Sequence, residues 1–195
     1  MGRRIGIFGG TFDPPHTGHL LLALDALDHL ALDRLVLVPA ARQPLKQDVA
    51  MTAPAHRLAM VEALAAADPR FAVDASEVAR GGLSYTVDTV RALQAAHPDA
   101  ELILLMGADT AATLPQWREP EALSLLVQVA VAGRGAEPVR LPAGFRAQPF
   151  PTRRVDISAT EVRARVAAGR SIRGFVPDAV AEYIAAHGLY RNTTE

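Results

Sequence analysis

The sequence contains no cysteine. Disulfides and thiolate metal sites are therefore excluded, and an intracellular location is permitted. No stretch reaches the roughly 18 consecutive apolar residues that a membrane-spanning helix needs, so we expect no contact with a membrane. The apolar stub near the N-terminus is too short for the core of a signal peptide. Together these absences predict a cytoplasmic protein.

The sequence also has no excess of charge of one sign. Lys and Arg together number 20, Asp and Glu together number 21, and the formal net charge is −1. Proteins dedicated to nucleic acids carry a clear basic excess, so we expect no nucleic-acid partner. The 195 residues, 50% of them hydrophobic, suffice for a single domain over 1–195 with a sizeable core. The sequence leaves open whether this domain forms a homo-oligomer.

Several familiar nucleotide-binding and catalytic patterns are missing as well. The dinucleotide fingerprint G-x-G-x-x-G and the phosphate loop G-x-x-x-x-G-K-[ST] do not occur, which excludes a standard NAD-binding turn and a P-loop ATPase. The nucleophile elbow G-x-S-x-G is absent too, so neither a cysteine nor a serine of this kind is available as a covalent nucleophile.

The sequence does contain short apolar runs that alternate with segments of helical periodicity. The runs expected to form strands are 4–8, 35–38, 71–73, 102–106 and 127–132. The segments expected to form helices are 17–30, 54–67, 85–96, 119–125, 160–168 and 178–187. Residues 40–53 are expected to be irregular. Residues 133–150 are expected to form a loop that could include one short strand. Continuous apolar strands that alternate with helices predict a doubly wound, Rossmann-like α/β fold, with a parallel sheet covered on both faces.

Polar stretches follow four of the expected strands. They are 9–19, 42–46, 107–109 and 133–134. Ligands of doubly wound sheets bind outside the carboxyl ends of the strands. We therefore expect these four stretches to meet at one binding site.

The stretch GGTFDPPHTGH follows the first expected strand. Gly9 and Gly10 predict a sharp turn that lets the backbone approach a ligand closely. His16 and His19 then stand at the start of a helix, where free N–H groups and a partial positive charge suit phosphate. Gly18 between them has no side chain to block a bound group. A histidine at a helix start is often only a cap or a surface residue, but the place of this pair after a strand favours a ligand site.

Two motifs resemble the signatures of the nucleotidyltransferase superfamily that carries H-x-G-H or T-x-G-H. GGTFDPPHTGH resembles the first signature. ISATEVR, at 157–163, resembles the second, usually I-S-S-T-x-x-R. Ala159 stands where the superfamily has its middle serine, so any contact from that hydroxyl is lost. The resemblance implies that the last helices, at about 158–190, close a nucleotide site.

The resemblance implies adenylyl or cytidylyl transfer without a covalent enzyme intermediate. A substrate attacks the α-phosphorus of a nucleoside triphosphate, and the protein positions groups and stabilises charge. His16 and His19 would bind the α- and β-phosphates, Lys46 and Arg163 the leaving β- and γ-phosphates. Mg²⁺ is expected with the triphosphate, held mainly by phosphate oxygens and water. The implied ATP-binding residues are Gly9, Gly10, Thr11, Phe12, His16, Gly18, His19, Gly107, Asp109, Ile157, Ser158, Thr160 and Arg163.

Further stretches resemble one branch of this superfamily, the bacterial nicotinate-nucleotide adenylyltransferases. They are SYTVDT at 84–89, MGAD at 106–109, LPQW at 114–117 and QPLK at 43–46. The resemblance, which spans 4–190, implies that the chain makes deamido-NAD and pyrophosphate from ATP and nicotinate mononucleotide.

The resemblance also assigns residues to the nicotinate half of the site. Trp117 would stack on the flat ring, and Ser84, Tyr85 and Thr86 would read its carboxylate, largely through backbone N–H groups at a helix start. Arg134 would lie near the substrate phosphate. Asp109 would accept hydrogen bonds from ribose hydroxyls of the adenosine half.

Each of these residues also has a plainer interpretation. Trp117 could simply pack, Asp109 could be a solvated loop residue, and Ser84 and Tyr85 could only cap a helix. Arg134 is followed by Gly-Ala-Glu rather than the family's Arg-Pro-Gly-Tyr, which puts its role in doubt.

The roles of two further positions, near the basic residues expected to bind phosphate, are also undecided. Leu45 stands where relatives often have His, so a second polar contact beside Lys46 is lost. Arg57, on the second expected helix, could reach the site or form a surface salt bridge.

Three alternative functions remain open at this point. Phosphopantetheine adenylyltransferases share the G-T-F-D-P turn but typically carry T-x-G-H and lack the SYTVDT-like and LPQW-like stretches. A nicotinamide-nucleotide adenylyltransferase, which uses the amide, is a closer alternative. A non-catalytic nucleotide-binding module is the third, although such proteins usually lose the histidines or the arginine that this chain retains.

Overall fold

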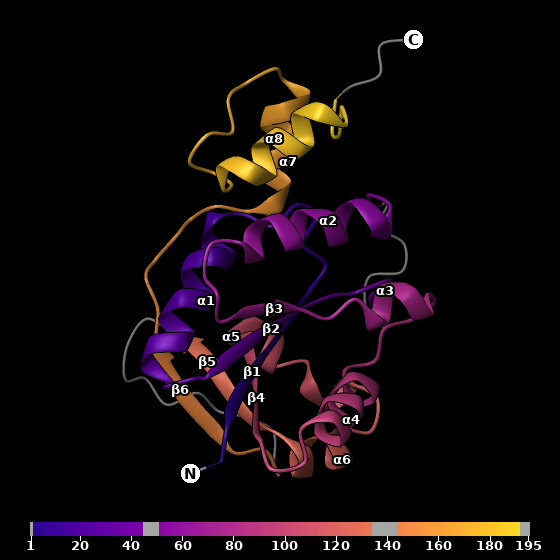
Figure 1. Cartoon of the computed structure of the whole chain (residues 1–195), viewed down its shortest axis with the longest axis vertical. Helices are drawn as coiled ribbons and strands as arrows, with labels where there is room; N and C mark the ends of the chain where they lie inside the picture. Colours follow the sequence, from indigo (N-terminus) through magenta and orange to yellow (C-terminus); the bar gives the residue numbers. More distant parts are fainter. Residues whose placement is uncertain (1, 45–50, 134–143, 192–195) are drawn as a thin grey trace.

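The computed structural model describes residues 2–44, 51–133 and 144–191. Its centre is a parallel six-stranded sheet in the order β3-β2-β1-β4-β5-β6 (Figure 1). The strands are β1 (Arg4–Gly10), β2 (Arg34–Pro39), β3 (Phe71–Val73), β4 (Glu101–Gly107), β5 (Gln128–Gly133) and β6 (Ala147–Pro151). The order runs outward from β1 in both directions, as in a doubly wound fold. The predicted fold class is confirmed.

Helices cover both faces of the sheet. They are α1 (Thr17–His29), α2 (Pro54–Ala65), α3 (Ser76–Arg80), α4 (Thr86–Ala96), α5 (Ala108–Ala111), the 3-10 helix η2 (Leu114–Gln116), α6 (Pro120–Leu126), α7 (Ala159–Ala167) and α8 (Asp178–Ala186). Side chains along β1 alternate between two buried clusters. Phe8 lies in the cluster that α1 and α2 cover, and Ile5 and Ile7 lie in the cluster that α4 and α6 cover. This alternation is the two-residue period of a strand that is buried on both sides.

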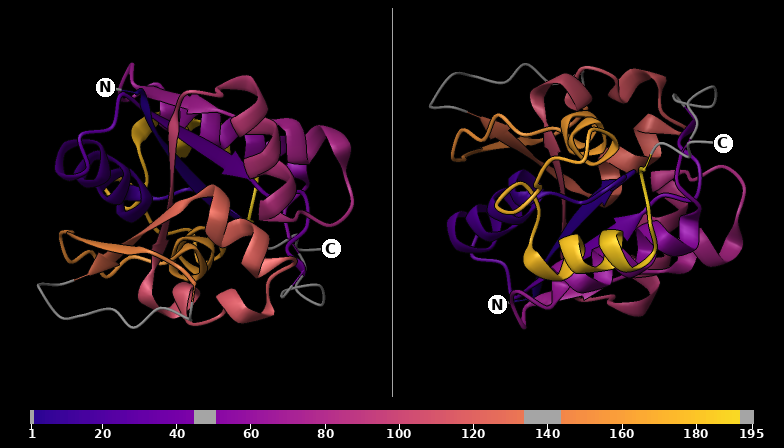
Figure 2. Two further views of the ribbon diagram at one scale, coloured as in Figure 1. Left: turned by 90° about the horizontal axis from the view of Figure 1, so that it is seen from below. Right: turned by 90° about the horizontal axis from the view of Figure 1, so that it is seen from above.

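The two last helices belong to the α1–α2 side of the molecule. Val162 of α7 and Val180 of α8 are both fully buried in that cluster. Figure 1 shows α7 and α8 at the end of the molecule opposite the N-terminus. Seen from above, α8 runs beside α2, against which it packs (Figure 2). This places the C-terminal segment at the carboxyl ends of the central strands.

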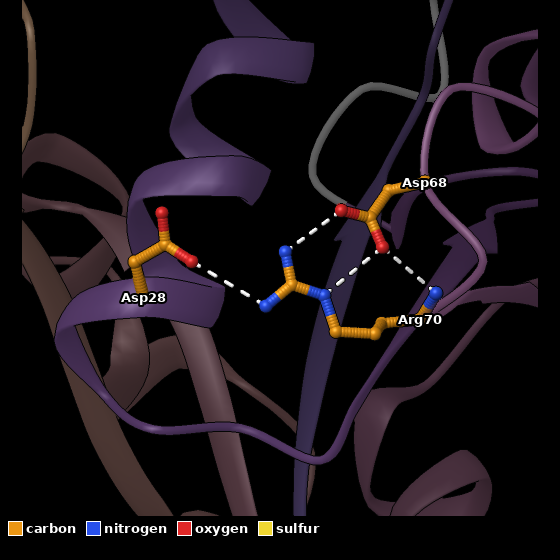
Figure 3. Close-up of polar contacts among 3 residues, drawn as sticks. All are labelled: Asp28, Asp68 and Arg70. Carbon is orange, nitrogen blue, oxygen red and sulfur yellow. Dashed lines mark hydrogen bonds and ion pairs between the residues drawn. The ribbon is translucent and has the colours of Figure 1, made fainter.

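At the opposite end of the sheet, exposed charged side chains link neighbouring segments of the chain. The side chain of Arg70, just before β3, donates to both carboxylate oxygens of Asp68 at 3.0 and 2.7 Å (Figure 3). Its remaining Nη1 lies 3.4 Å from Asp28, near the end of α1. All three residues lie on the amino side of the strands, so their contacts link α1 to the turn before β3 and are remote from the expected site. Exposed pairs of this kind contribute little to stability.

Most predicted elements are confirmed, with three additions and one correction. The helices α3, α5 and η2 were not predicted, since each is too short to show a periodicity. The short strand allowed in 133–150 is β6. The correction concerns Gly9 and Gly10, which continue β1 instead of forming a turn. The backbone changes direction beyond them, at Phe12, whose φ is +50°. Among the described helices, none has the length and apolar character needed to cross a membrane.

Candidate active site

The turn that follows β1 is packed by aromatic rings. Phe12 lies edge-on to Phe8, with ring centroids 5.5 Å apart, and to His19, at 5.0 Å. A side chain at Gly10 would come within 3.0 Å of the Phe12 ring. This glycine is therefore explained by packing within the protein. Burial of the Phe12 ring holds its backbone in the left-handed region, which a bulky residue rarely occupies.

His16 and His19 frame the start of α1. His16 is the N-cap residue, and its backbone N–H donates to Nδ1 of His19 at 3.1 Å. An Nδ1 that accepts carries no proton, so the proton of a neutral His19 ring is on Nε2. The two rings lie close together, with centroids 3.7 Å apart and planes tilted by 32°. The pair therefore presents two neighbouring imidazoles at a helix N-terminus.

Both imidazoles are held in the neutral form by burial. Burial lowers the pKa of His16 to about 4. Burial, and then the neighbouring charge of His16, lower the pKa of His19 to about 3. Near pH 7 the pair therefore offers N–H donors and no net positive charge.

Two buried polar atoms beside this pair find no partner within the described residues. They are Nδ1 of His16 and Oγ1 of Thr11. Buried polar atoms are normally hydrogen-bonded, so unsatisfied ones call for a ligand or water. A side chain at Gly18 would come within 3.0 Å of His16 Nδ1 and 3.6 Å of Val155. Gly18 thus leaves room for the imidazole of His16 and for the chain segment that leads to the second motif.

The second motif reaches the first through Arg163. Its Nη1 donates to the backbone carbonyl of Asp13 at 2.7 Å, and its Nη2 donates to Oγ1 of Thr160 at 3.2 Å. Ser158 caps α7, because its hydroxyl accepts the backbone N–H of Glu161 at 3.1 Å. The structure therefore brings His16, His19, Ser158, Thr160 and Arg163 to one edge of the sheet, although about 140 residues separate the motifs.

Three further hydrogen bonds fix the segments on either side of α7. Asp25, buried on α1, accepts the backbone N–H of Arg153 at 3.0 Å. Thr17, the first residue of α1, donates its N–H to the carbonyl of Phe175 and its hydroxyl to that of Gly174, both at 2.8 Å. Helix α1 is thus held at its start by chain that follows α7 and near its middle by chain that precedes α7.

Among the residues that the structure describes, Arg57 has no salt-bridge partner. It is fully buried and donates to the backbone carbonyls of four residues, which are Thr52, Thr11, Ala40 and Ala41. The apolar surroundings lower its pKa, while Asp13 and Tyr190 act in the opposite direction. Arg57 therefore ties the turn after β1 to the chain that follows β2. The sequence does not reveal this role, because isolated arginines on helices are mostly exposed.

The residues predicted to read nicotinate lie at the start of α4 and after η2. Ser84 is buried, and its hydroxyl accepts the backbone N–H of Ala41 at 2.9 Å. Tyr85 is the N-cap residue of α4, and Thr86 is the first residue of that helix. In the part of the chain that the structure describes, no side chain caps this helix start. The first N–H groups of α4 therefore have no side-chain acceptor among the described residues, and free N–H groups at a helix start suit an anion.

Arg118, which directly follows Trp117, lies over this helix start. Trp117 is half-buried against the α4–α6 cluster, and its Nε1 donates to Oγ1 of Thr113 at 2.9 Å. The guanidinium of Arg118 lies 4.7 Å above the ring of Tyr85 and 3.8 Å from Asp88. Packing and ligand binding are thus both compatible with Trp117. Arg118 was not among the predicted site residues, and only its place beside LPQW could have signalled it.

The remaining predicted residues are more dispersed. Asp109 is exposed in the first turn of α5, directly after Gly107 at the end of β4. Ile157 is half-buried against the α1–α2 cluster. Lys46 and Arg134, together with Leu45, lie outside the described residues. Asp13, Arg57 and Tyr190 were not predicted as functional residues, although Asp13 stands inside the first motif.

Comparisons with known proteins identify the family of the chain. Residues 7–165 match the cytidylyltransferase-like family. A protein of Gemmatimonas aurantiaca named probable nicotinate-nucleotide adenylyltransferase is 52% identical over 196 residues, covering 96% of this chain and 92% of that protein. A relative of the same name from Thermus thermophilus is 44% identical over 191 residues, covering 96% of this chain and 100% of its own length.

A solved structure shares the fold. Nicotinic acid mononucleotide adenylyltransferase of Plasmodium falciparum, complexed with NaAD, superimposes with a TM-score of 0.73 and covers 96% of this chain and 97% of its own. The sequence identity is 19%, so this comparison concerns the fold alone.

Proposed function

The chain belongs to the cytidylyltransferase-like family and, within it, to the nicotinate-nucleotide adenylyltransferases, and from this premise we propose which of its residues carry the reaction. The enzyme transfers the adenylyl group of ATP to nicotinate mononucleotide, which yields deamido-NAD and pyrophosphate. The observation that carries our assignment is the contact of Arg163 with the carbonyl of Asp13 at 2.7 Å. It joins the second motif to the turn that holds both histidines.

We propose a direct in-line transfer. The phosphate of nicotinate mononucleotide attacks the α-phosphorus of ATP, and pyrophosphate leaves from the opposite side. His19 donates from Nε2, His16 donates from its own ring, and the N-terminus of α1 adds backbone donors. Arg163, with Lys46, holds the leaving phosphates. Because the buried imidazoles are neutral, the positive charge opposite the phosphates comes from the basic side chains and the metal ion.

The nicotinate carboxylate fits the open start of α4. The backbone N–H groups there and the partial positive charge of the helix end favour a carboxylate over a carboxamide. The guanidinium of Arg118 lies above the Tyr85 ring beside this helix start, where its charge is offset by Asp88 and Glu119. Trp117 then provides a flat face for the pyridine ring. These features support the acid as substrate, and the amide is the alternative that the experiment below separates.

We propose that Mg²⁺ enters with ATP. Among the described residues no group of three or more His, Cys, Asp or Glu side chains is placed to hold a metal ion. Both carboxylate oxygens of the buried Asp13 already accept protein donors. The residues present therefore fit a metal ion that is held by phosphate oxygens and water. When bound, it neutralises phosphate charge, while the chain's own donors orient the triphosphate. Helices α7 and α8 close this nucleotide site.

Pyrophosphate release with ATP and Mg²⁺ tests the proposal. Nicotinate mononucleotide, nicotinamide mononucleotide and phosphopantetheine are compared as acceptors at equal concentrations. We expect strong preference for the acid. Equal rates with acid and amide would refute the proposed reading of the carboxylate at α4, and release with phosphopantetheine alone would refute the substrate assignment.

A further inference from the structure

Asp13 is a buried carboxylate at the centre of the turn between the two motifs, with 6% of its surface exposed. Its Oδ1 accepts the phenol of Tyr190 at 2.6 Å, and its Oδ2 accepts the backbone N–H of Thr52 at 3.1 Å. Its carbonyl accepts Arg163. One residue thus joins the turn after β1 to α7, to the chain before α2 and to the chain after α8.

The residues around Tyr190 favour the hydrogen bond from its hydroxyl to Asp13. It lies just beyond the end of α8 with a φ of +62°, a conformation that costs free energy for a residue with a bulky side chain. Its hydroxyl also lies 4.0 Å from the sulfur of Met60, on α2. Burial and the hydrogen bond to Asp13 raise the pKa of the phenol, and the nearby charge of Arg163 opposes this more weakly. The phenol is therefore a permanent donor at physiological pH.

The consequence concerns the direction in which Arg163 points. A guanidinium has five N–H groups in a rigid plane, so fixing two of them fixes the others. The carbonyl of Asp13 and the hydroxyl of Thr160 fix two. The position of the Asp13 carbonyl depends in turn on the side chain of Asp13, which Tyr190 holds. A chain of contacts therefore runs from Tyr190 through Asp13 to Arg163.

We infer that Tyr190 is a positioning residue for adenylyl transfer, which it serves by fixing Asp13 and thereby aiming Arg163 at the leaving phosphates. The inference rests on the proposed role of Arg163. The inferred positioning role of Tyr190 differs from a merely structural one. In a structural role, Tyr190 would only hold the C-terminal segment against the rest of the domain.

The first test replaces Tyr190 by Phe, which removes the hydroxyl and keeps the ring. We expect kcat to fall about tenfold and the affinity for pyrophosphate to fall severalfold, because a misdirected guanidinium loses phosphate contacts. The matched control is Tyr183→Phe on α8, which removes a phenol that lies 3.0 Å from Nδ1 of His56, away from the motifs. The control should leave kcat and pyrophosphate affinity within about twofold of wild type. Equal behaviour of the two variants would overturn the inference.

A double-mutant cycle separates positioning from structure. Tyr190→Phe is combined with Arg163→Lys, and kcat is measured for all four proteins. If Tyr190 acts through Arg163, the second substitution adds little to the first. Additive losses would mean that the two residues act independently, which would overturn the inference.

Two further measurements keep the test decisive. Should Tyr190→Phe prove unstable, Asp13→Ala breaks the same network, because alanine offers no polar atom to the phenol of Tyr190 or to the N–H of Thr52. The same losses of kcat and pyrophosphate affinity are expected, and unchanged values would count against the inference. Pyrophosphate affinity, measured by calorimetry, does not depend on the acceptor. A wild-type chain that binds pyrophosphate but does not use nicotinate mononucleotide would refute the proposed function, and the affinity of Tyr190→Phe would still decide the role of Tyr190.

Discussion

The backbone N–H of His16 donates to Nδ1 of His19 at 3.1 Å, while the two imidazoles lie 3.7 Å apart. This single contact settles the tautomer of His19 and leaves its Nε2–H as a donor. It also explains the spacing of the motif. In a helix that begins after His16, the third helical residue is the one whose side chain reaches back to the N-cap. A spacing of three residues is thus needed for the local geometry as well as for the ligand.

The replacement of His19 by Ala should lower kcat by about a hundredfold or more, because it removes one charge-stabilising donor. The fold should persist, since the imidazole lies at the edge of the core. Steady-state pyrophosphate release and thermal unfolding measure the two effects. His29→Ala, at the exposed end of the same helix, is the matched control. Near-normal turnover of His19→Ala would remove this residue from the mechanism.

The buried imidazoles predict a pH dependence of stability. The folded-state pKa values of about 4 for His16 and about 3 for His19 lie below the unfolded value of about 6.5. Between these values the unfolded chain binds more protons than the folded chain. Stability is therefore complete above pH 6.5 and falls as the pH drops toward 4 and then 3, by up to about 1.4 kcal/mol per pH unit for each histidine.

Urea unfolding at a series of pH values, with His16→Gln as the comparison, measures this slope. The variant should lose part of the decrease below pH 6.5. Histidine NMR spectra give the same answer directly, since the imidazole signals that disappear in His16→Gln and His19→Ala should not titrate above pH 5. Titration of either signal near pH 6.5 would contradict the assignment of neutral, buried rings.

Gly9 offers a test of ligand approach. Within the described part of the chain, a Cβ at this position would meet no atom within 4 Å, and the residue does not need the left-handed region. The protein alone therefore does not require a glycine here. If ATP approaches the backbone at the end of β1, Gly9→Ala should leave the melting temperature unchanged and weaken ATP binding by about tenfold. Unaltered ATP affinity would show that the ligand passes elsewhere.

The role of Trp117 can be tested by comparing two ligands. Trp117→Ala should weaken nicotinate mononucleotide binding more than ATP binding, because stacking on the pyridine ring is lost while the phosphate site is untouched. An aromatic stack contributes about 0.5–1.5 kcal/mol, so a loss of affinity of about two- to tenfold is expected by calorimetry. An equal loss for both ligands would indicate that Trp117 only packs against the α4–α6 cluster.

Arg57 should be a strong determinant of stability. Arg57→Met keeps much of the volume but leaves the four backbone carbonyls around Arg57 without their donor. Buried carbonyls without partners are costly, and we expect the free energy of unfolding to fall by roughly 3 kcal/mol or more. Arg70→Met, which removes the exposed arginine of Figure 3, should change it little. Urea unfolding measures both, and a similar small effect of the two substitutions would contradict the buried role of Arg57.

The strands and long helices were predictable because each depends on a local pattern. The run LVLV at 35–38 and the run LILLM at 102–106 could only be buried strands of a covered sheet, and both are. The short helices α3, α5 and η2 escaped prediction, since a helix of one turn shows no periodicity. The Gly9–Gly10 pair was misread because glycine permits a turn without requiring one. The backbone turns at the nearby Phe12 instead, where packing of the ring holds the left-handed conformation.

The sequence by itself therefore determined the fold class, the edge of the sheet at which we propose the chemistry, and the two motifs that identify the family. The fold class and the edge follow from hydrophobic period and from the place of polar stretches after the strands, whereas the two motifs identify the family through their resemblance to its signatures. Only the tertiary structure decided that His19 carries its proton on Nε2, that Arg57 is buried, and that Tyr190 meets Asp13 across 177 residues of sequence. The physical reason is that burial and hydrogen-bond partners depend on how distant segments pack together, and no local pattern encodes that packing.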